Sequence, residues 1–353
     1  MKKDIVVKKV LEGKRLNKEE ALSLFEIPIE ELGFLAREVR FRLNPDRVVT
    51  YVVDRNINYT NVCISGCKFC AYYKPPNSKE GYVLSFEELG KKIEETISLG
   101  GYQILLQGGL HPDLPFSFYE DMLRFIKTTF PQVHVHGFSP PEIVFFSKKF
   151  GLSITEVLER LIKAGLDSIP GGGAEILSDR VRKFLSPNKA TAEEWLNVME
   201  IAHKLGLKTT ATMMFGHIET QEEIIEHLLK IRDLQDKTRG FTAFIPWTFQ
   251  PKNTGLSHLI KAGAAYYLKV LAISRIVLDN VKNLQVSWVT QGPHIAQIAL
   301  EFGGNDFGST MIEENVVAAA GVSHRMSEEE IRHHILSAGY IPKRRKMDYT
   351  LIE

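Results

Sequence analysis

The stretch VVTYVVDRNINYTNVCISGCKFC, residues 48–70, joins a strand pattern to a cluster of cysteines. Its first six residues are rich in β-branched side chains, which favour a strand, and residues 54–61 predict a loop leading to the cysteines. Cys63, Cys67 and Cys70 are the only three cysteines in 353 residues. Three thiolates at the spacing C-x3-C-x2-C can bind three irons of a cubane cluster and leave the fourth iron open, which favours a catalytic centre over a structural one.

After the cysteines the chain repeats the order strand, loop, helix. The strand pattern recurs, with the first strand included, at residues 48–53, 102–107, 133–138, 167–169, 209–215, 241–247, 284–289 and 305–308. Apolar strands that alternate with amphipathic helices indicate parallel βαβ units. Eight such units predict an α/β fold of the (β/α)8 TIM-barrel type rather than a doubly wound sheet.

Two extensions flank the predicted barrel. Residues 1–44 predict a helical N-terminal extension, and residues 45–320 predict the barrel itself. Residues 321–353 predict a C-terminal extension packed on the barrel, with a helix at 328–338. The charged run Arg344-Arg345-Lys346 near the end of this tail is expected to be solvated.

Composition limits the partners. The chain has 44 basic and 43 acidic residues, a net charge of +1, so no basic field favours nucleic acid or an anionic membrane. The N-terminus lacks the apolar core of a signal peptide, and no apolar run is long enough for a membrane span. We therefore expect a cytoplasmic protein in which the clustered thiols stay reduced.

A structural zinc site is the alternative interpretation of the cysteines. Such a site needs four ligands in a closed tetrahedral arrangement, and the sequence offers no fourth cysteine. The nearest histidine, His111, follows a whole predicted helix and strand. The sequence therefore favours the cluster.

Glycine-rich and polar segments follow several predicted strands. Gly108-Gly109 follows the second strand, Gly171–Glu175 the fourth, Gly216-His217 the fifth and Thr290–Gly292 the seventh. In a (β/α)8 barrel the loops at the carboxyl ends of the strands carry the chemistry. These segments are therefore expected to meet the cysteine loop at one mouth of the barrel.

The cysteine motif, with Phe69 just before its last cysteine, resembles that of the radical S-adenosylmethionine (SAM) enzymes, and the resemblance runs from about Val49 to the C-terminus. Residues 58–61 and 70–73 are similar to the subgroup that acts in futalosine-dependent menaquinone synthesis and in deazaflavin synthesis. Within it, residues 167–175, 245–251 and 303–308 most resemble the cyclases that act on dehypoxanthine futalosine.

The resemblance implies a 4Fe-4S cluster on the three cysteines, SAM at its open iron, and an external one-electron reductant such as flavodoxin or ferredoxin. It implies a small-molecule reaction: a 5′-deoxyadenosyl radical takes hydrogen from the ribose C4′ of dehypoxanthine futalosine, and the ring closes on the benzoate. Aminofutalosine synthase and a deazaflavin (F0) synthase subunit are alternatives. A non-catalytic electron-transfer protein is disfavoured, since carriers normally use four protein ligands.

The resemblance also implies residues that bind SAM: Tyr72, Gln107, Gly108, Gly109, Glu175 and Arg182. Gln107 and the two glycines would contact the methionine part, Tyr72 the adenine and Glu175 the ribose. Arg182 has the donor geometry to pair with the methionine carboxylate, and Arg180 is a weaker substitute. The structural alternatives are a tight turn for the glycines, loop packing for Tyr72 and a surface charge for Arg182.

The candidate substrate residues are Trp247, Gln250, Thr290, Asn305 and Ser309, all at predicted carboxyl ends of strands. His217 and Asp306 are the candidate catalytic bases, because closure onto an aromatic ring must release a proton. A hydrogen-bonded structural histidine is the alternative for His217, and barrel packing is the alternative for Trp247. His134 and His136, two apart on the third strand, share a face and are secondary candidates.

Overall fold

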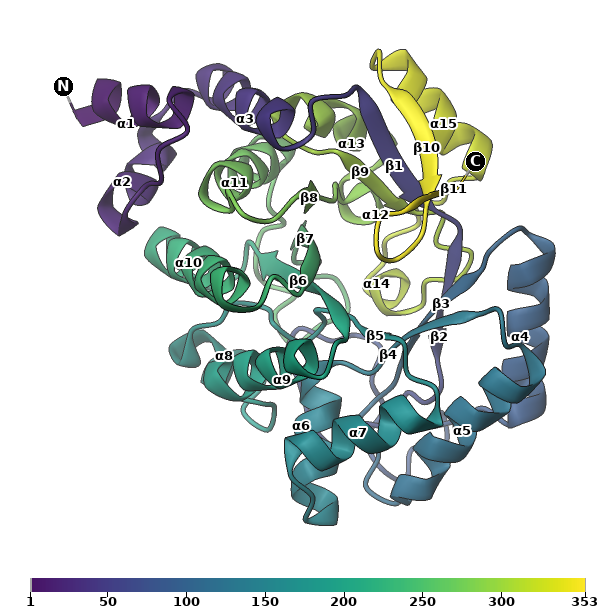
Figure 1. Ribbon diagram of the computed structural model, residues 1–353. Helices are drawn as coiled ribbons and strands as arrows, with labels where there is room; N and C mark the ends of the chain where they lie inside the picture. The colour runs from purple at the N-terminus through teal and green to yellow at the C-terminus, as the bar shows by residue number, and fades with distance from the viewer. Residues whose placement is uncertain (1, 353) are drawn as a thin grey trace.

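The computed structural model describes residues 2–352 and begins with three helices outside the barrel. These are α1 (Lys2–Leu11), α2 (Lys18–Ser23) and α3 (Ile29–Leu43) (Figure 1). Asn17 and Glu20 form a capping box at the start of α2. The helix α3 lies against α11 (Ala264–Val277), so the extension is packed on the barrel wall.

Parallel strands form the barrel. They are β1 (Val48–Val52), β2 (Asp54–Asn58), β3 (Gln103–Gln107), β4 (His134–Gly137), β5 (Ser168–Ile169), β6 (Lys208–Phe215), β7 (Phe241–Thr248), β8 (Asn283–Leu284) and β9 (Asp306–Ser309). Strands β2 to β8 are hydrogen-bonded neighbours in chain order, and β9 pairs with β1. A parallel bridge between Gln285 and Asp306 joins the segment after β8 to β9. Because β1 continues into β2, the ring closes, and the predicted barrel is confirmed.

Two predicted segments differ from the structure. Residues 54–61 were expected to be a loop, but residues 54–58 form β2, whose side chains are all buried. The sequence pattern does not reveal this strand because its residues are polar. Asp54 accepts a hydrogen bond from Gln103, and Arg55 pairs with Glu95. Conversely, the strand expected at 284–289 ends at Leu284, because the chain then turns into α12 (Trp288–Gln291).

The helices surround the ring and bury its outer face. Along β3, Ile104 and Leu106 point outward and are fully buried, whereas Gln103 and Gln107 face the lumen. The remaining helices of the barrel are α4 (Phe86–Ser98), α5 (Phe116–Thr129), α6 (Pro140–Phe150), α7 (Ile154–Ala164), α8 (Asp179–Leu185), α9 (Ala192–Lys204), α10 (Gln221–Thr238), α13 (Pro293–Ala299) and α14 (Val316–Ala319). The hydrophobic core therefore lies between ring and helices, and the lumen is left for polar groups.

The C-terminal tail is part of the barrel. After α15 (Glu328–Ser337), β10 (Ile341–Arg345) pairs in parallel with β1, and β11 (Leu351–Ile352) pairs antiparallel with β10 (Figure 1). The expected solvation of the charged run is therefore wrong for Arg345, which is 4% exposed. Its guanidinium binds both carboxylate oxygens of Asp306, the first residue of β9.

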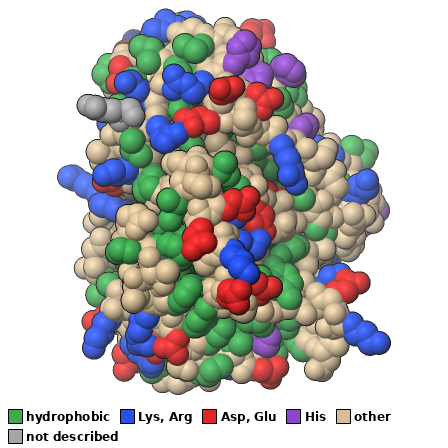
Figure 2. Space-filling view, turned by 90° about the vertical axis from the view of Figure 1, so that its right-hand side faces the viewer, with side chains coloured by type: hydrophobic (Ala, Val, Ile, Leu, Met, Phe, Trp, Pro, Cys, Tyr) green, Lys and Arg blue, Asp and Glu red, His purple; other side chains and the backbone are tan. Residues whose placement is uncertain are grey.

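The surface carries no large field of one sign on the face shown in Figure 2, where acidic and basic side chains are interspersed. Among the described residues, no helix is long and apolar enough to cross a bilayer.

Candidate active site

The cysteine loop follows β2 and gathers its three thiols at the carboxyl end of the barrel. The hydroxyl of Ser65 lies 3.4 Å from the sulfur of Cys63 and 3.0 Å from that of Cys67. The backbone N–H of Leu110 also donates to Cys63 Sγ, at 3.3 Å. Within residues 2–352, no group of three or more His, Cys, Asp and Glu side chains is placed to hold a single metal ion. Three soft sulfur donors on one loop fit an iron–sulfur cluster.

Burial of the thiols makes their ionisation depend on a bound cation. Desolvation raises the pKa of Cys67 to about 11 and also raises the pKa of Cys70. Iron supplies the positive charge that keeps such thiols deprotonated. The loop is therefore built for a ligand that carries its own charge.

A cavity of about 260 Å³ fills the lumen beneath this loop. Inward-facing side chains at alternate strand positions line it, including Asp54, Asn56, Gln103, Gln107, His136, Thr210, Thr212, Trp247, Gln285 and Ser309. Arg345 and Met347 of the tail line it as well. A smaller space of about 40 Å³ lies between Cys70 and Trp247, so Trp247 borders both spaces. A ligand held at the cysteine loop would therefore be next to a polar lumen.

The segment 171–175 forms part of the cavity wall. Residues Gly171, Gly172, Gly173 and Glu175 all line the lumen. A Cβ on Gly172 would lie 2.6 Å from Gln107 Nε2, and one on Gly173, where φ is +73°, would lie 2.3 Å from Pro141. Glycine is therefore required here for close packing as well as for backbone shape. Glu175 itself adopts φ +42°, an uncommon conformation for a non-glycine residue.

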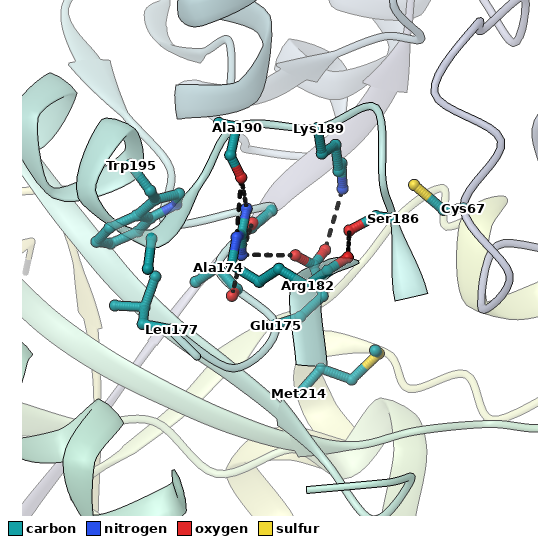
Figure 3. Close-up of polar contacts among 12 residues, drawn as sticks. Cys67, Ala174, Glu175, Leu177, Arg182, Ser186, Lys189, Ala190, Trp195 and Met214 are labelled. Carbon is teal, nitrogen blue, oxygen red and sulfur yellow. Dashed lines mark hydrogen bonds and ion pairs between the residues drawn. The ribbon is translucent and has the colours of Figure 1, made fainter. Parts of the chain in front are cut away.

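Arg182, a predicted SAM ligand, uses its guanidinium for contacts within the protein. It is 3% exposed, and its guanidinium donates to the carbonyls of Ala174 and Ala190 and lies 3.3 Å from Glu175 Oε2 (Figure 3). These contacts hold the glycine segment against the start of α9 and leave Arg182 outside the cavity lining. The structure favours a positioning role over ligand contact for this residue. Arg180 pairs with Glu223 and is a surface charge.

Lys189 is a cation of this site that the sequence analysis missed. Its ammonium lies 3.0 Å from Glu175 Oε1 and 5.1 Å from the centroid of the Phe69 ring, and Figure 3 shows the Cys67 sulfur on the same side. Burial opposes its charge, but the Glu175 carboxylate and the Cys67 thiol outweigh burial and raise the pKa of the amine. Lys189 follows a turn rather than a strand, so no sequence periodicity marked it.

The other predicted SAM residues fall into two groups. Gln107 lines the cavity. Added Cβ atoms on Gly108 and Gly109 would lie 2.3 Å from the Tyr59 ring and 2.2 Å from the Val62 carbonyl, so these glycines allow close packing beneath the cysteine loop. Tyr72 hydrogen-bonds the hydroxyl of Tyr82 and does not line the large cavity.

Most of the predicted substrate residues face the two spaces. Trp247, Thr290 and Ser309 line the lumen, and Gln250 lines the smaller space. Asn305 does not: it accepts from Arg275 and from the Leu284 N–H, and it precedes β9 instead of following it. Its expected place at a carboxyl end is wrong, because it lies at the amino end of β9, whose first residue is Asp306.

Neither predicted base lines the cavity. Asp306 starts β9, at the opposite end of the barrel from the cysteines, and it binds Arg345, Thr50 and the Gly308 N–H. The ring of His217 is fully buried, with Nε2 3.0 Å from the Met214 carbonyl and Nδ1 accepting from the Ile218 N–H at 2.7 Å. Both residues stabilise the fold in this arrangement, whereas His136 and Asp54 face the lumen.

Comparison with solved structures places the fold among known enzymes. The hydrogenase maturase HydG of Carboxydothermus hydrogenoformans matches with a TM-score of 0.76 at 18% identity, over 98% of this chain and 80% of that one. Methylornithine synthase (PylB) matches with a TM-score of 0.74 at 18% identity, over 96% and 97% of the two chains. At this identity the likeness concerns the fold alone.

Sequence comparison defines the family. A model of the Radical SAM superfamily matches residues 57–231, and one described as CofH/MqnC C-terminal region matches residues 238–353. Cyclic dehypoxanthine futalosine synthase of Halalkalibacterium halodurans is 47% identical over 99% of this chain and 95% of its own. The Streptomyces coelicolor protein of that name is 44% identical, over 96% and 86%. The 5-amino-6-(D-ribitylamino)uracil--L-tyrosine 4-hydroxyphenyl transferase of Methanocaldococcus jannaschii is 43% identical, over 96% and 98%. The chain therefore belongs to the radical SAM superfamily, in the group that carries the CofH/MqnC C-terminal region.

Proposed function

We propose that this radical SAM enzyme closes dehypoxanthine futalosine to its cyclic form in menaquinone synthesis. The observation that carries the proposal is the 47% identity to a cyclic dehypoxanthine futalosine synthase over 99% of the chain. The lumen supports it, because alternate strand positions present hydrogen-bonding side chains that suit the hydroxyls of a sugar.

The cluster and SAM are the cofactors implied by the superfamily. We assign Cys63, Cys67 and Cys70 as the cluster ligands. When bound, these groups supply a 5′-deoxyadenosyl radical that takes hydrogen from the ribose C4′. The protein binds and orients the reactants and keeps water away.

Around the cofactor, each residue has a proposed role that follows from its place. Glu175, at the cavity wall, accepts hydrogen bonds from the SAM ribose. Lys189, beside Cys67 and Glu175, pairs with the methionine carboxylate in place of Arg182. Trp247, which borders both spaces, separates the cofactor from the substrate and offers a ring for stacking on the benzoate.

The residues that face the substrate lie deeper in the lumen. Thr290 and Ser309 line it, and Ser309 donates to Asp54. Asn56 lines the cavity, and its amide oxygen is buried and has no partner among the described residues. A buried acceptor without a partner costs free energy, and a substrate hydroxyl would satisfy it.

A second candidate function is transfer of the tyrosine hydroxyphenyl group to 5-amino-6-(D-ribitylamino)uracil. The archaeal relatives of that name favour it, since they match at 42–43% identity over more than nine-tenths of the chain. Both reactions use a polyhydroxylated substrate, so the polar lumen fits either. The somewhat higher identity to the cyclases, 44–47%, favours the first.

The deciding experiment compares the two substrates in one protein. Anaerobically reconstituted enzyme is reduced with dithionite and incubated with SAM plus either dehypoxanthine futalosine or tyrosine and 5-amino-6-(D-ribitylamino)uracil. We expect 5′-deoxyadenosine and the cyclic product with the first substrate only. Product from the second pair instead would show that the protein is the transferase. Absence of SAM cleavage at full cluster occupancy would contradict the proposed radical SAM activity.

Cluster ligation is tested separately by spectroscopy. Replacement of each cysteine by alanine should abolish the visible absorbance of the iron–sulfur cluster, whereas Ser65→Ala should retain it. Bound zinc in the wild-type protein would contradict the assignment. The external reductant is proposed to be a flavodoxin or ferredoxin, in a cytoplasmic setting that keeps the three thiols reduced.

A further inference from the structure

A chain of three side chains leads from the lumen to the lower rim of the barrel. His136 Nδ1 lies 2.7 Å from Ser168 Oγ, and the same oxygen lies 2.7 Å from His134 Nε2. The two histidines are two residues apart on β4 and therefore share a face. Ser168 is the partner of His136 in the pairing of β4 with β5, which sets the hydroxyl between the two rings.

The two ends of this chain lie in different surroundings. His136 is 5% exposed and lines the cavity, and its Nε2 has no hydrogen-bond partner among the described residues. His134 is half-buried at the first residue of β4, outside the cavity lining, near Asp167 and Lys127. The three hydrogen-bonded side chains thus connect the free Nε2 of His136 in the lumen to the end of the barrel opposite the cysteines.

We propose that His136, Ser168 and His134 form a proton relay that carries a proton from the substrate out through the lower end of the barrel. The inference rests on the proposed function, because ring closure is the step that releases the proton. His136 is the catalytic base of this relay, and the other two residues act through it. Arg345 and Met347 of the tail cover the lumen from below, so the relay provides a path where the tail restricts water.

Addition of the sugar radical to the aromatic ring leaves a ring carbon that still bears hydrogen. Its C–H bond breaks, the proton binds His136 Nε2, the bonding pair restores the aromatic ring, and the unpaired electron leaves to an external one-electron acceptor such as an oxidised ferredoxin. His136 Nδ1–H then donates to Ser168, and Ser168 donates to His134 Nε2. His134 releases its Nδ1 proton at the rim.

The surroundings of the two rings favour transfer of the proton over its retention on either ring. Burial, helped by His134 and Arg345, holds the pKa of His136 well below its usual value, so the ring is neutral at physiological pH. Burial likewise lowers the pKa of His134, with Asp167 and Asp348 opposing this effect and Lys127 adding to it. Two neutral rings on either side of one hydroxyl can hand a proton along without either staying charged.

The first test measures coupling between the two halves of the reaction. Ser168→Ala should leave 5′-deoxyadenosine formation intact but lower the cyclic product per 5′-deoxyadenosine about ten-fold or more. Ser168→Thr, which keeps a hydroxyl, should recover most of the product. The matched control is Ser274→Ala, which removes a buried hydroxyl of α11 that bonds Val270 far from the lumen. Unchanged coupling in Ser168→Ala would overturn the relay.

The second test needs no substrate. In the resting relay the Ser168 hydroxyl accepts from His136 Nδ1–H and donates to His134 Nε2, which leaves His136 Nε2 free for the substrate proton, so both histidines must carry their proton on Nδ1. Nitrogen NMR of 15N-histidine-labelled protein, assigned with His134→Gln and His136→Gln, reads this directly. An Nε2–H tautomer of either histidine, or a charged ring at pH 7.5, would overturn the relay. Failure of dehypoxanthine futalosine to trigger SAM cleavage would instead overturn the proposed function and leave the NMR result to decide the relay.

Discussion

Glu175 is held by two cations that differ in what else they bind. Arg182 donates to three backbone carbonyls besides the carboxylate, whereas Lys189 makes a single hydrogen bond and borders the cysteine loop. Replacing Arg182 should therefore affect mainly stability, whereas replacing Lys189 should affect mainly the binding of SAM.

We expect Arg182→Met to lower the free energy of unfolding by about 3–5 kcal/mol, because it leaves buried carbonyls without donors. Lys189→Met should cost about 1–2 kcal/mol of stability but raise the Kd for SAM about ten-fold or more, because it removes a charge-assisted contact. Urea unfolding and titration of SAM into cluster-loaded protein measure the two effects. Lys183→Met, an exposed cation of α8, is the control. Loss of SAM affinity with intact stability in Arg182→Met would reverse the two roles.

For single residues, the sequence predicted the position along the barrel better than the direction in which the side chain points. The cysteines, Gln107 and Glu175 lie where the barrel pattern puts them, because each follows or ends a strand. The periodicity of a sequence does not say which way a loop side chain turns, so the buried ring of His217 was indistinguishable from a catalytic one. Lys189 has no neighbouring strand and no pattern to reveal it.

Buried polar contacts join elements that are distant in the chain. Asp306 of β9 binds Arg345 of β10 and Thr50 of β1, with side chains that are 0–5% exposed for the ion pair. Removing one partner leaves an unpaired buried charge, so we expect Asp306→Asn and Arg345→Met each to lower the free energy of unfolding by about 3–5 kcal/mol. The double variant should lose less than the sum of the two. Simple additivity in a double-mutant cycle by denaturant unfolding would show that the pair is uncoupled.

A second buried contact links α10 to the loop after β5. His227 Nδ1 accepts from the Leu177 N–H at 3.1 Å, and burial lowers the pKa of this histidine from 6.5 to about 3. Between these values the unfolded chain binds a proton that the folded chain does not, so stability is complete above pH 6.5 and falls as the pH drops. The loss is about 1.4 kcal/mol per pH unit in this window.

Replacement of His227 by Gln keeps an acceptor for Leu177 but removes the titration. Urea unfolding between pH 6.5 and 4.5 should therefore show a smaller loss of stability for His227→Gln than for the wild type, by about 2.5 kcal/mol at the lower limit. Other groups titrate in both proteins, so the difference isolates this one. Parallel curves would mean that His227 titrates normally in the folded state.

Element boundaries were predictable where apolar residues alternate and not where polar residues pair inside the barrel. The strand β6 matches the predicted strand 209–215 to within one residue, because its apolar residues meet the core. The strand β2 was missed because its inward-facing Asp54 binds Gln103 of β3 and Ser309 of β9 instead of burying apolar surface. The same rule hid β10, whose Arg345 pairs with Asp306 of another strand.

At the scale of the whole molecule, the last residues of the chain cover the lower end of the barrel. The sheet order β11-β10-β1-β9 places the tail beside the first strand, and Arg345 and Met347 form part of the cavity wall. The tail is therefore structural support and cavity floor at once, which no count of strand–helix units could show. The eight repeats predicted the ring but not what covers its lower end.

Truncation after Tyr340 tests this role of the tail. The shortened protein loses β10, leaves Asp306 without Arg345 and opens the lumen from below, so we expect a lower Tm and a loss of substrate binding. The cysteine loop lies at the other end of the barrel, so a folded fraction should still take up the cluster.

The control removes only residues 351–353, which keeps Arg345 and Met347 in place and should bind substrate normally. Normal substrate affinity in the longer truncation would show that the tail is not the floor of the cavity, whereas a defect in the control would point to β11 itself. Among the described residues β10 pairs with β1 and β11 alone, so the contrast between the two truncations assigns the effect to residues 341–350, which include Arg345 and Met347.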